Sequence, residues 1–263
     1  MTDRISAAIN TEISADDRKA ILKFILGSVD LTSLNGNDTR NKIKELCEKA
    51  LYSEMPAAAV CTYPVFLKEA SEWLKGTGIN KAVVAGGFPG GQVPALVKKN
   101  EVQYAVDHGA DEVDFVINRG FMLEGRFDEV YEEVFMAAQL CRDIHLKVIL
   151  ETGELKTESN IRRASEIAMT AGADFIKTST GKVQPAATLE ATLVMLDAIR
   201  AHHKKTNRMV GIKPAGGISD ADTSINYYLL TKHVLGKAWI NKSYFRIGAS
   251  RLFDNILNEL SSG

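Results

Sequence analysis

Short apolar runs rich in valine and isoleucine recur eight times along this 263-residue chain, and longer segments of helical periodicity lie between them. The predicted strands are residues 25–32, 57–62, 81–85, 112–117, 146–151, 174–179, 209–213 and 244–247. Before the sixth run, residues 161–171 place isoleucine and alanine at helical spacing, after a Thr157 cap and before Gly172. Alternating strands and helices predict βαβ units and a parallel sheet.

Eight such units predict an α/β fold, a closed (β/α)8 TIM barrel, in one domain over residues 1–263. The alternative is an open doubly wound sheet, which calls for a Gly-rich turn directly after the first strand. Residues 30–35 stand there instead, with the sequence DLTSLN and no G-x-G-x-x-G pattern. Residues 1–20 are polar and predict an extra helical or partly ordered segment in front of the barrel.

The composition excludes several classes of protein. The net charge is −1, so no basic field invites nucleic acid or an anionic membrane surface. No apolar run approaches the ~20 residues that span a bilayer, and the polar N-terminus lacks the apolar core of a signal peptide. The three cysteines, an odd number without metal-site spacing, argue against a disulfide framework. We therefore expect a cytoplasmic protein that acts on small molecules.

Two segments place a lone charged residue at the same offset in an otherwise apolar strand. HGADEVDF (108–115) and AGADFIKT (171–178) share Gly-Ala-Asp, and Asp114 and Lys177 both lie five residues past the glycine. Because alternate strands of an eight-stranded barrel share an interior layer, these two side chains are predicted to be neighbours. The alternative is that Gly-Ala-Asp is an ordinary helix-to-strand connection and that a strand lysine has a solvated tip at the rim.

Strand alternation adds further charges to this interior. Lys213 on the seventh strand has inward parity, like Asp114 and Lys177, and Lys147 and Glu151 on the fifth strand have the same option. A buried lysine beside a second cation has a pKa below the usual ~10.4. Its free amine can then attack a carbonyl and form a Schiff base, while Asp114 shuttles a proton directly or through water. This reasoning leaves open which lysine is the nucleophile.

Three late turns are rich in small residues: STGK (179–182), PAGGIS (214–219) and IGAS (247–250). Loops after the last strands of a barrel often bind phosphate through backbone N–H groups. The predicted phosphate contacts are Gly181, Lys182, Gly216, Gly217, Gly248, Ser250 and Arg251. The alternative is ordinary loop glycine. Since the G-x-x-x-x-G-K-[ST] frame is absent, we expect a phosphorylated metabolite rather than a nucleoside triphosphate.

Five segments are shared with a known family. They are DLTSLN (30–35), GADEVDFVIN (109–118), KVILETGEL (147–155), FIKTSTGK (175–182) and GIKPAGGI (211–218), and together they resemble the 2-deoxyribose-5-phosphate aldolases. The resemblance implies a (β/α)8 barrel and a class I aldolase without metal or other cofactor. Such an enzyme reversibly cleaves 2-deoxy-D-ribose 5-phosphate to D-glyceraldehyde 3-phosphate and acetaldehyde, in deoxyribose catabolism. By motif, Lys177 is implied to form the Schiff base, Lys213 to lower its pKa and Asp114 to transfer the proton.

The resemblance also implies where the sugar lies. Asp30 and Thr32 are implied to be near it, and we expect Lys147 and Thr180 to contact it. Cys61, at the end of the second predicted strand, is either close to the aldehyde or a buried structural cysteine.

Other points stay open. The family's turn GASS reads GASR here, so Arg251 either adds a phosphate contact or faces solvent. The aromatic segment 225–230 fits helix packing or the contact of a homodimer. The competing functions are a sugar-phosphate isomerase, which needs a carboxylate base and no paired lysines, and a sensor that binds sugar phosphate without turnover.

Overall fold

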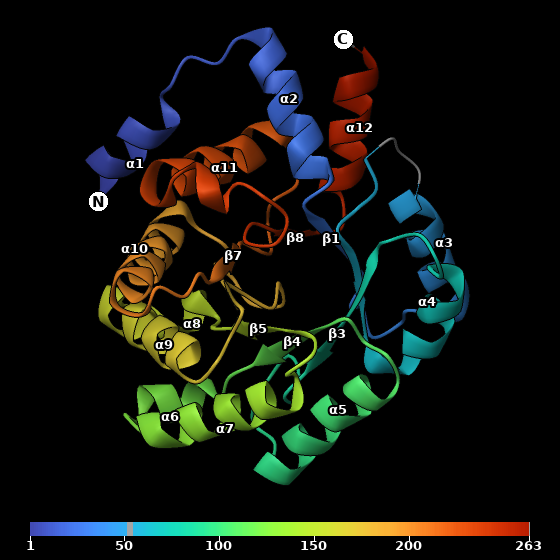
Figure 1. Cartoon of the computed structure of the whole chain (residues 1–263), viewed down its shortest axis with the longest axis vertical. Helices are drawn as coiled ribbons and strands as arrows, with labels where there is room; N and C mark the ends of the chain where they lie inside the picture. The colour runs from blue at the N-terminus through green and yellow to red at the C-terminus, as the bar shows by residue number, and fades with distance from the viewer. Residues whose placement is uncertain (52–54, 263) are drawn as a thin grey trace.

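The structure, a computed structural model, describes residues 1–51 and 55–262. Over these residues, eight parallel strands follow one another in the order β7-β6-β5-β4-β3-β2-β1-β8 (Figure 1). The strands are β1 Val29–Thr32, β2 Ala59–Thr62, β3 Asn80–Ala85, β4 Glu112–Val116, β5 His145–Ile149, β6 Phe175–Lys177, β7 Gly211–Lys213 and β8 Ile247–Ala249.

The sheet closes on itself. β1 pairs with β2 on one side and with β8 on the other. Parallel bridges from Ile212 to Phe245 and from Ala215 to Gly248 make the seam between β7 and β8. Figure 1 looks into the resulting ring, with helices around its outside. The predicted (β/α)8 barrel is confirmed, and the open doubly wound sheet was the wrong alternative.

Helices connect the strands and form the outer layer. They are α3 Arg40–Leu51, α4 Leu67–Trp73, α5 Ala95–Asp107, α6 Arg119–Leu123, α7 Phe127–Leu140, α8 Thr152–Leu155, α9 Glu158–Thr170, α10 Leu189–Thr206, α11 Ala221–Leu235 and α12 Leu252–Ser262, with 3₁₀ turns η1 Pro64–Phe66 and η2 Lys237–Trp239. The predicted cap of α9 is present, since Thr157 Oγ1 accepts a hydrogen bond from the Asn160 amide at 3.2 Å. Within the described ranges, no helix combines the length and the apolarity needed to cross a membrane.

Two helices precede the barrel, as the polar start of the chain predicted. They are α1 Thr2–Ile9 and α2 Ala15–Leu26, and they pack against α10, α11 and α12 (Figure 1). Ser14 caps α2 by accepting from the Asp17 amide at 3.1 Å. An ion pair of 2.7 Å between Arg4 and Asp197 joins α1 to α10.

Two predicted strands, the first and the last, begin three or more residues too early in the sequence. Residues 25–28 of the first run belong to the end of α2 and its turn, because a short apolar run fits a buried helix as well as a buried strand. In the last run, Phe245 is buried against the rings of Phe24 and Tyr228, and β8 starts only at Ile247. Small residues form β8 for a steric reason: a Cβ at Gly248 would lie 2.9 Å from Ala215 Cβ.

The barrel interior is divided between apolar and charged side chains. On β2 and β3, the small residues Ala59, Cys61, Ala82 and Val84 form an apolar cluster that also includes Leu34. The inward positions of β1 and of β4 to β7 instead carry buried ionisable side chains: Asp30, Glu112, Asp114, Lys147, Lys177 and Lys213. The outward positions, such as Val113 and Phe115, pack in the large core beneath the helices. This division concentrates charge on one side of the interior.

Candidate active site

Asp114 on β4 is the centre of the interior charges. Its Oδ2 lies 2.6 Å from Nζ of Lys177 on β6 and 2.6 Å from Nζ of Lys213 on β7. These are the neighbours that the strand parity predicted. Nζ of Lys147 on β5 lies 3.2 Å from Oδ1, yet Oδ1 accepts no hydrogen bond of regular geometry from any described residue. Oδ1 is therefore a buried oxygen with a lone pair that no regular hydrogen bond from the described residues uses.

The two lysines differ in their surroundings. Lys213 also contacts Asp30 on β1, with Nζ 2.5 Å from Oδ2, so two carboxylates hold it. Lys177 pairs with Asp114 and is the lysine of the pair that lines the cleft above the interior. Register places the two side by side, since Lys177 pairs with Lys213 in the β6–β7 ladder. Access and pairing thus favour Lys177 as the reactive amine.

The pKa values of Lys177 and Lys213 shift in opposite directions. Burial lowers the pKa of Lys177, and the nearby Lys213 lowers it further, against the attraction of Asp114. For Lys213, burial alone would lower the pKa, but Asp114 and Asp30 outweigh it and raise the pKa. Burial would likewise raise the pKa of Asp114, but Lys147, Lys177 and Lys213 together hold it well below its usual value. The site therefore combines a weakly basic amine, a stable cation and an anionic carboxylate.

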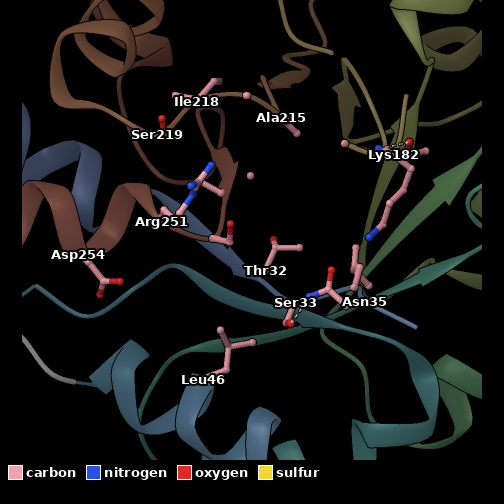
Figure 2. Close-up of a pocket in the computed structure, with 18 of the residues that line it drawn as sticks. Thr32, Ser33, Asn35, Leu46, Lys182, Ala215, Ile218, Ser219, Arg251 and Asp254 are labelled. Carbon is pink, nitrogen blue, oxygen red and sulfur yellow. Dashed lines mark hydrogen bonds between the residues drawn. The ribbon is translucent and has the colours of Figure 1, made fainter. Parts of the chain in front are cut away.

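A cleft of about 560 Å³ opens above Lys177. The loops after β1, β6, β7 and β8 form its walls, so every predicted phosphate contact lies on it: Gly181, Lys182, Gly216, Gly217, Gly248, Ser250 and Arg251. In the view of Figure 2, Lys182 and Arg251 lie on opposite sides of the cleft, with Thr32 between them. Thr180 also lines it. The rim combines cationic tips with exposed backbone, which suits an anionic group.

The close approach of two backbone turns explains why position 216 is a glycine. Gly216 has φ +85°, and a Cβ there would lie 2.7 Å from Ala186 Cβ and 3.0 Å from Gly181 Cα. The turns after β6 and β7 therefore touch through their glycines, and their backbones come together at the cleft wall.

Three predicted substrate contacts lie beneath the cleft wall. Asp30, Lys147 and Cys61 are fully buried and do not line the cleft. Cys61 Sγ lies 3.9 Å from Asp114 Oδ2, and burial raises the pKa of the thiol to about 11. Cys61 is therefore a buried neutral thiol that borders the central carboxylate, and its closeness to an aldehyde stays a prediction.

The position of Glu151 differs from the prediction that its side chain faces the barrel interior. It lies just after β5 with a left-handed φ of 57°, and its carboxylate accepts from the Thr180 amide at 3.3 Å and from the Thr180 hydroxyl. It thereby holds the loop after β6 rather than joining the interior charges.

Sequence reasoning missed two groups of residues. Ser33, Asn35, Lys42 and Lys49 line the cleft from the β1–α3 region. Ser33 and Asn35 belong to the DLTSLN segment but were not predicted as contacts, and no motif marked Lys42 or Lys49. Glu112 and Arg246 are buried below the site and pair with each other. Glu112 shares its parity with Asp114, two residues later, so strand alternation alone could have indicated it.

A closed barrel with a buried amine beside a carboxylate and a phosphate-compatible rim defines the class of (β/α)8 aldolases that work through a lysine imine. Residues 24–226 match the model of the DeoC/LacD family of aldolases, and the chain belongs to this family.

The chain is 43% identical to the deoxyribose-phosphate aldolase of Homo sapiens over 248 residues, which cover 88% of this chain and 78% of that protein. The identity to the Mus musculus deoxyribose-phosphate aldolase is also 43%, with the same coverage. A deoxyribose phosphate aldolase structure from Aeropyrum pernix superposes with a TM-score of 0.74 at 23% identity, covering 95% of this chain and 99% of that chain. This last likeness concerns the fold alone.

Proposed function

We propose that the protein is a class I aldolase that reversibly cleaves 2-deoxy-D-ribose 5-phosphate to D-glyceraldehyde 3-phosphate and acetaldehyde. The observation that carries the proposal is the position of Lys177, which shares Oδ2 of Asp114 with Lys213 and opens into the cleft. The 43% identity to the human deoxyribose-phosphate aldolase supports the choice of substrate.

The first step is imine formation. The amine of Lys177 attacks C1 of the open-chain sugar, and loss of water leaves a protonated imine. Lys213 keeps its proton because two carboxylates surround it, so it disfavours a proton on the free Lys177 amine. Neither the attack of the amine nor the loss of water needs a metal, and we propose that the enzyme works without a metal or organic cofactor.

The imine then draws electrons from the bond that breaks. Cleavage between C2 and C3 sends its electron pair toward the iminium nitrogen and gives an enamine, while the C3 hydroxyl loses its proton and becomes the aldehyde of glyceraldehyde 3-phosphate. We assign the proton transfer to Asp114, whose Oδ1 accepts no regular hydrogen bond from the described residues. Protonation of the enamine carbon and hydrolysis release acetaldehyde and restore Lys177.

The rim of the cleft holds the phosphate. Backbone N–H groups at Gly181, Gly216 and Gly217 and the cations of Lys182 and Arg251 supply the contacts. Thr32 and Thr180 also line the cleft and are available to the sugar hydroxyls. We place the enzyme in the reducing cytoplasm, in keeping with its free cysteines, Cys47, Cys61 and Cys141. A homodimer stays a prediction.

Borohydride trapping tests the function. The protein is incubated with acetaldehyde or deoxyribose 5-phosphate, reduced, digested and examined by peptide mass spectrometry. We expect acetaldehyde to leave an ethyl group on the peptide that carries Lys177, and the Lys177→Ala variant to lose both the adduct and turnover. An adduct on Lys213 instead would reverse the roles of the lysines. Phosphate-dependent binding without any adduct would favour an isomerase or a sensor and overturn the proposal.

A further inference from the structure

A second layer of charges lies beneath the catalytic lysine. The guanidinium of Arg246, which directly precedes β8, is 2% exposed and donates to Oδ1 of Asp30 at 2.6 Å. It also donates to the two carboxylate oxygens of Glu112 at 2.8 and 3.3 Å. Lys147 contacts the same two carboxylates, 2.6 Å from Asp30 Oδ2 and in close contact with Glu112 Oε2. We call Asp30, Glu112, Lys147 and Arg246 the lower charge layer.

Asp30 joins this layer to the reactive site. Its Oδ1 is bonded to Arg246, which leaves Oδ2 directed at Lys213 at 2.5 Å and at Lys147 at 2.6 Å. Lys213 in turn contacts Asp114, the carboxylate that it shares with Lys177. Arg246 therefore acts on Lys177 through two carboxylates and one lysine, without touching the cleft.

The charges of this interior balance in one protonation state. Among the described residues, its ion pairs join three carboxylates to four cationic groups: Asp30, Glu112 and Asp114, with Lys147, Lys177, Lys213 and Arg246. The interior is neutral when Lys177 has lost its proton and carries one net positive charge when Lys177 holds it. Because an unbalanced charge in a buried site is unfavourable, the balanced state favours the free amine.

We propose that Arg246 is a positioning residue for the imine chemistry: it supplies the third permanent cation of the interior and fixes Asp30 toward Lys213, so that Lys177 is left as a free amine. This inference rests on the proposed function. The directions of the pKa shifts agree with it. Burial opposes the proton on each cation, yet carboxylates raise the pKa of Arg246, Lys147 and Lys213, while that of Lys177 is lowered.

Other groups face these charges and enter the test. Glu112 also accepts from Asn80 Nδ2 at 2.8 Å and lies 3.6 Å from Nδ1 of the half-exposed His145. The ring of Phe175 lies 5.7 Å from the guanidinium, and the backbone carbonyl of Lys242 accepts a hydrogen bond from Arg246 Nε. The thiol of Cys61 acts on Lys177 by raising its pKa. The interaction with Glu112 raises the pKa of His145 above its usual value, so the imidazole is a titratable group beside this layer.

Charge-balanced variants test the inference. The rate of borohydride-trappable imine formation with acetaldehyde is measured against pH in the parent protein, Arg246→Met, Arg246→Lys, Glu112→Gln and the double variant Arg246→Met/Glu112→Gln. Arg246→Met should move the midpoint of this pH–rate profile upward by about one pH unit, so the rate of imine formation at a pH below the midpoint falls about tenfold. Glu112→Gln should move it downward. The double variant and Arg246→Lys should return it toward the parent value.

The outcomes separate the inference from the proposed function. An equal loss of rate at every pH, with unmoved midpoints, would mean that Arg246 is only structural and would overturn the inference while the Lys177 adduct persists. Absence of the adduct in the parent protein would overturn the function itself. If circular dichroism shows that Arg246→Met does not fold, the opposite shift in Glu112→Gln still decides the matter. The same shifts in a His145→Asn background exclude the imidazole as their source.

Discussion

The amino groups of Lys177 and Lys213 contact one and the same carboxylate oxygen, Oδ2 of Asp114, each at 2.6 Å. One negative oxygen cannot fully stabilise two ammonium groups, so one lysine must hold its proton less firmly. Asp30 decides which one, because it gives Lys213 a second carboxylate at 2.5 Å. The arrangement divides two chemically identical side chains into a stable cation and a more weakly basic amine.

Replacing Lys213 tests this division. In Lys213→Leu, Lys177 loses its neighbouring cation and becomes the one lysine at Oδ2 of Asp114 among the described residues, so the pKa of Lys177 rises. We expect the midpoint of the pH–rate profile to move upward by about one unit and turnover at neutral pH to fall at least tenfold. The measurement is kcat/KM for deoxyribose 5-phosphate between pH 5 and 10. An unshifted profile would show that Lys213 has another role.

Asp114→Asn separates imine formation from proton transfer. The amide can no longer carry the proton, and such transfers contribute about 10² to 10⁴ in rate. We expect turnover to fall by that factor while the borohydride adduct on Lys177 still forms. NMR in deuterated water gives the second readout, since exchange of the acetaldehyde methyl protons through the enamine should slow in parallel. Exchange at the parent rate would remove Asp114 from the proton transfer.

A Cβ at position 216 should weaken phosphate binding. Gly216→Ala brings a methyl group within 2.7 Å of Ala186 Cβ and displaces the two touching turns. We expect KM for deoxyribose 5-phosphate to rise about tenfold, because a contact to a charged group contributes roughly 1.5–3 kcal/mol. KM for unphosphorylated deoxyribose should change far less.

Gly109→Ala is the matched control for that variant. Its φ of +83° imposes similar backbone strain, nothing lies within 4 Å of the added Cβ, and it does not line the cleft. Equal increases in KM in both alanine variants would attribute the effect to strain rather than to the rim.

Cys61 should be chemically inert in the folded protein. Burial raises the pKa of its thiol to about 11, so little thiolate exists at neutral pH. We expect iodoacetamide to leave Cys61 unmodified at pH 8 under native conditions and to alkylate it after unfolding in urea, as read by peptide mass spectrometry. Rapid native alkylation would contradict the buried neutral thiol.

Acid should destabilise the barrel through its interior carboxylates. Burial would raise the pKa of Glu112, but Lys147, His145 and Arg246 overcome it and lower the pKa to about 2, from an ordinary value of 4.5. A carboxylate with a lowered pKa stabilises the fold fully above its unfolded pKa and loses that contribution as the pH falls toward the folded value. For Glu112 the contribution is on the order of 3 kcal/mol. Asp30 and Asp114 act in the same direction.

Thermal melts followed by circular dichroism measure this effect. Tm should vary little between pH 7 and pH 5 and fall steeply from about pH 4 downward. Glu112→Gln should melt lower than the parent at pH 7 but lose less between pH 5 and pH 3. A parent Tm independent of pH across that acid interval would contradict the prediction.

Much of the site could be predicted because strand parity is a local property. Alternation along β4, β6 and β7 placed Asp114, Lys177 and Lys213 inward, and the barrel made them neighbours. Parity could not tell which lysine is the more stable cation, because that depends on Asp30, which comes from a distant part of the chain. The assignment of Lys177 from sequence came from the family resemblance alone.

Other features depend on geometry that no local pattern encodes. The early start given to β1 arose because apolar runs do not distinguish buried helix from buried strand. The early start given to β8 arose because Tyr244 and Phe245 lie in a turn and an isolated bridge ahead of the strand. The cleft residues Ser33 and Asn35 lie on a loop without periodicity, so only the folded backbone brings them to the rim. A single domain over residues 1–263 and the catalytic roles of the site residues stay predictions.

The closure of the barrel has a consequence for how the protein is made. β1 finds its second partner in β8, and Asp30 is bonded to Arg246, 216 residues further along the chain. A nascent chain emerges from the ribosome with its first strand and that carboxylate unpaired until a segment 216 residues later has been synthesised. Ribosome stalling before Arg246 would therefore leave an unfinished ring with exposed strand edges, a form suited to chaperones or proteases, rather than a weaker version of the enzyme.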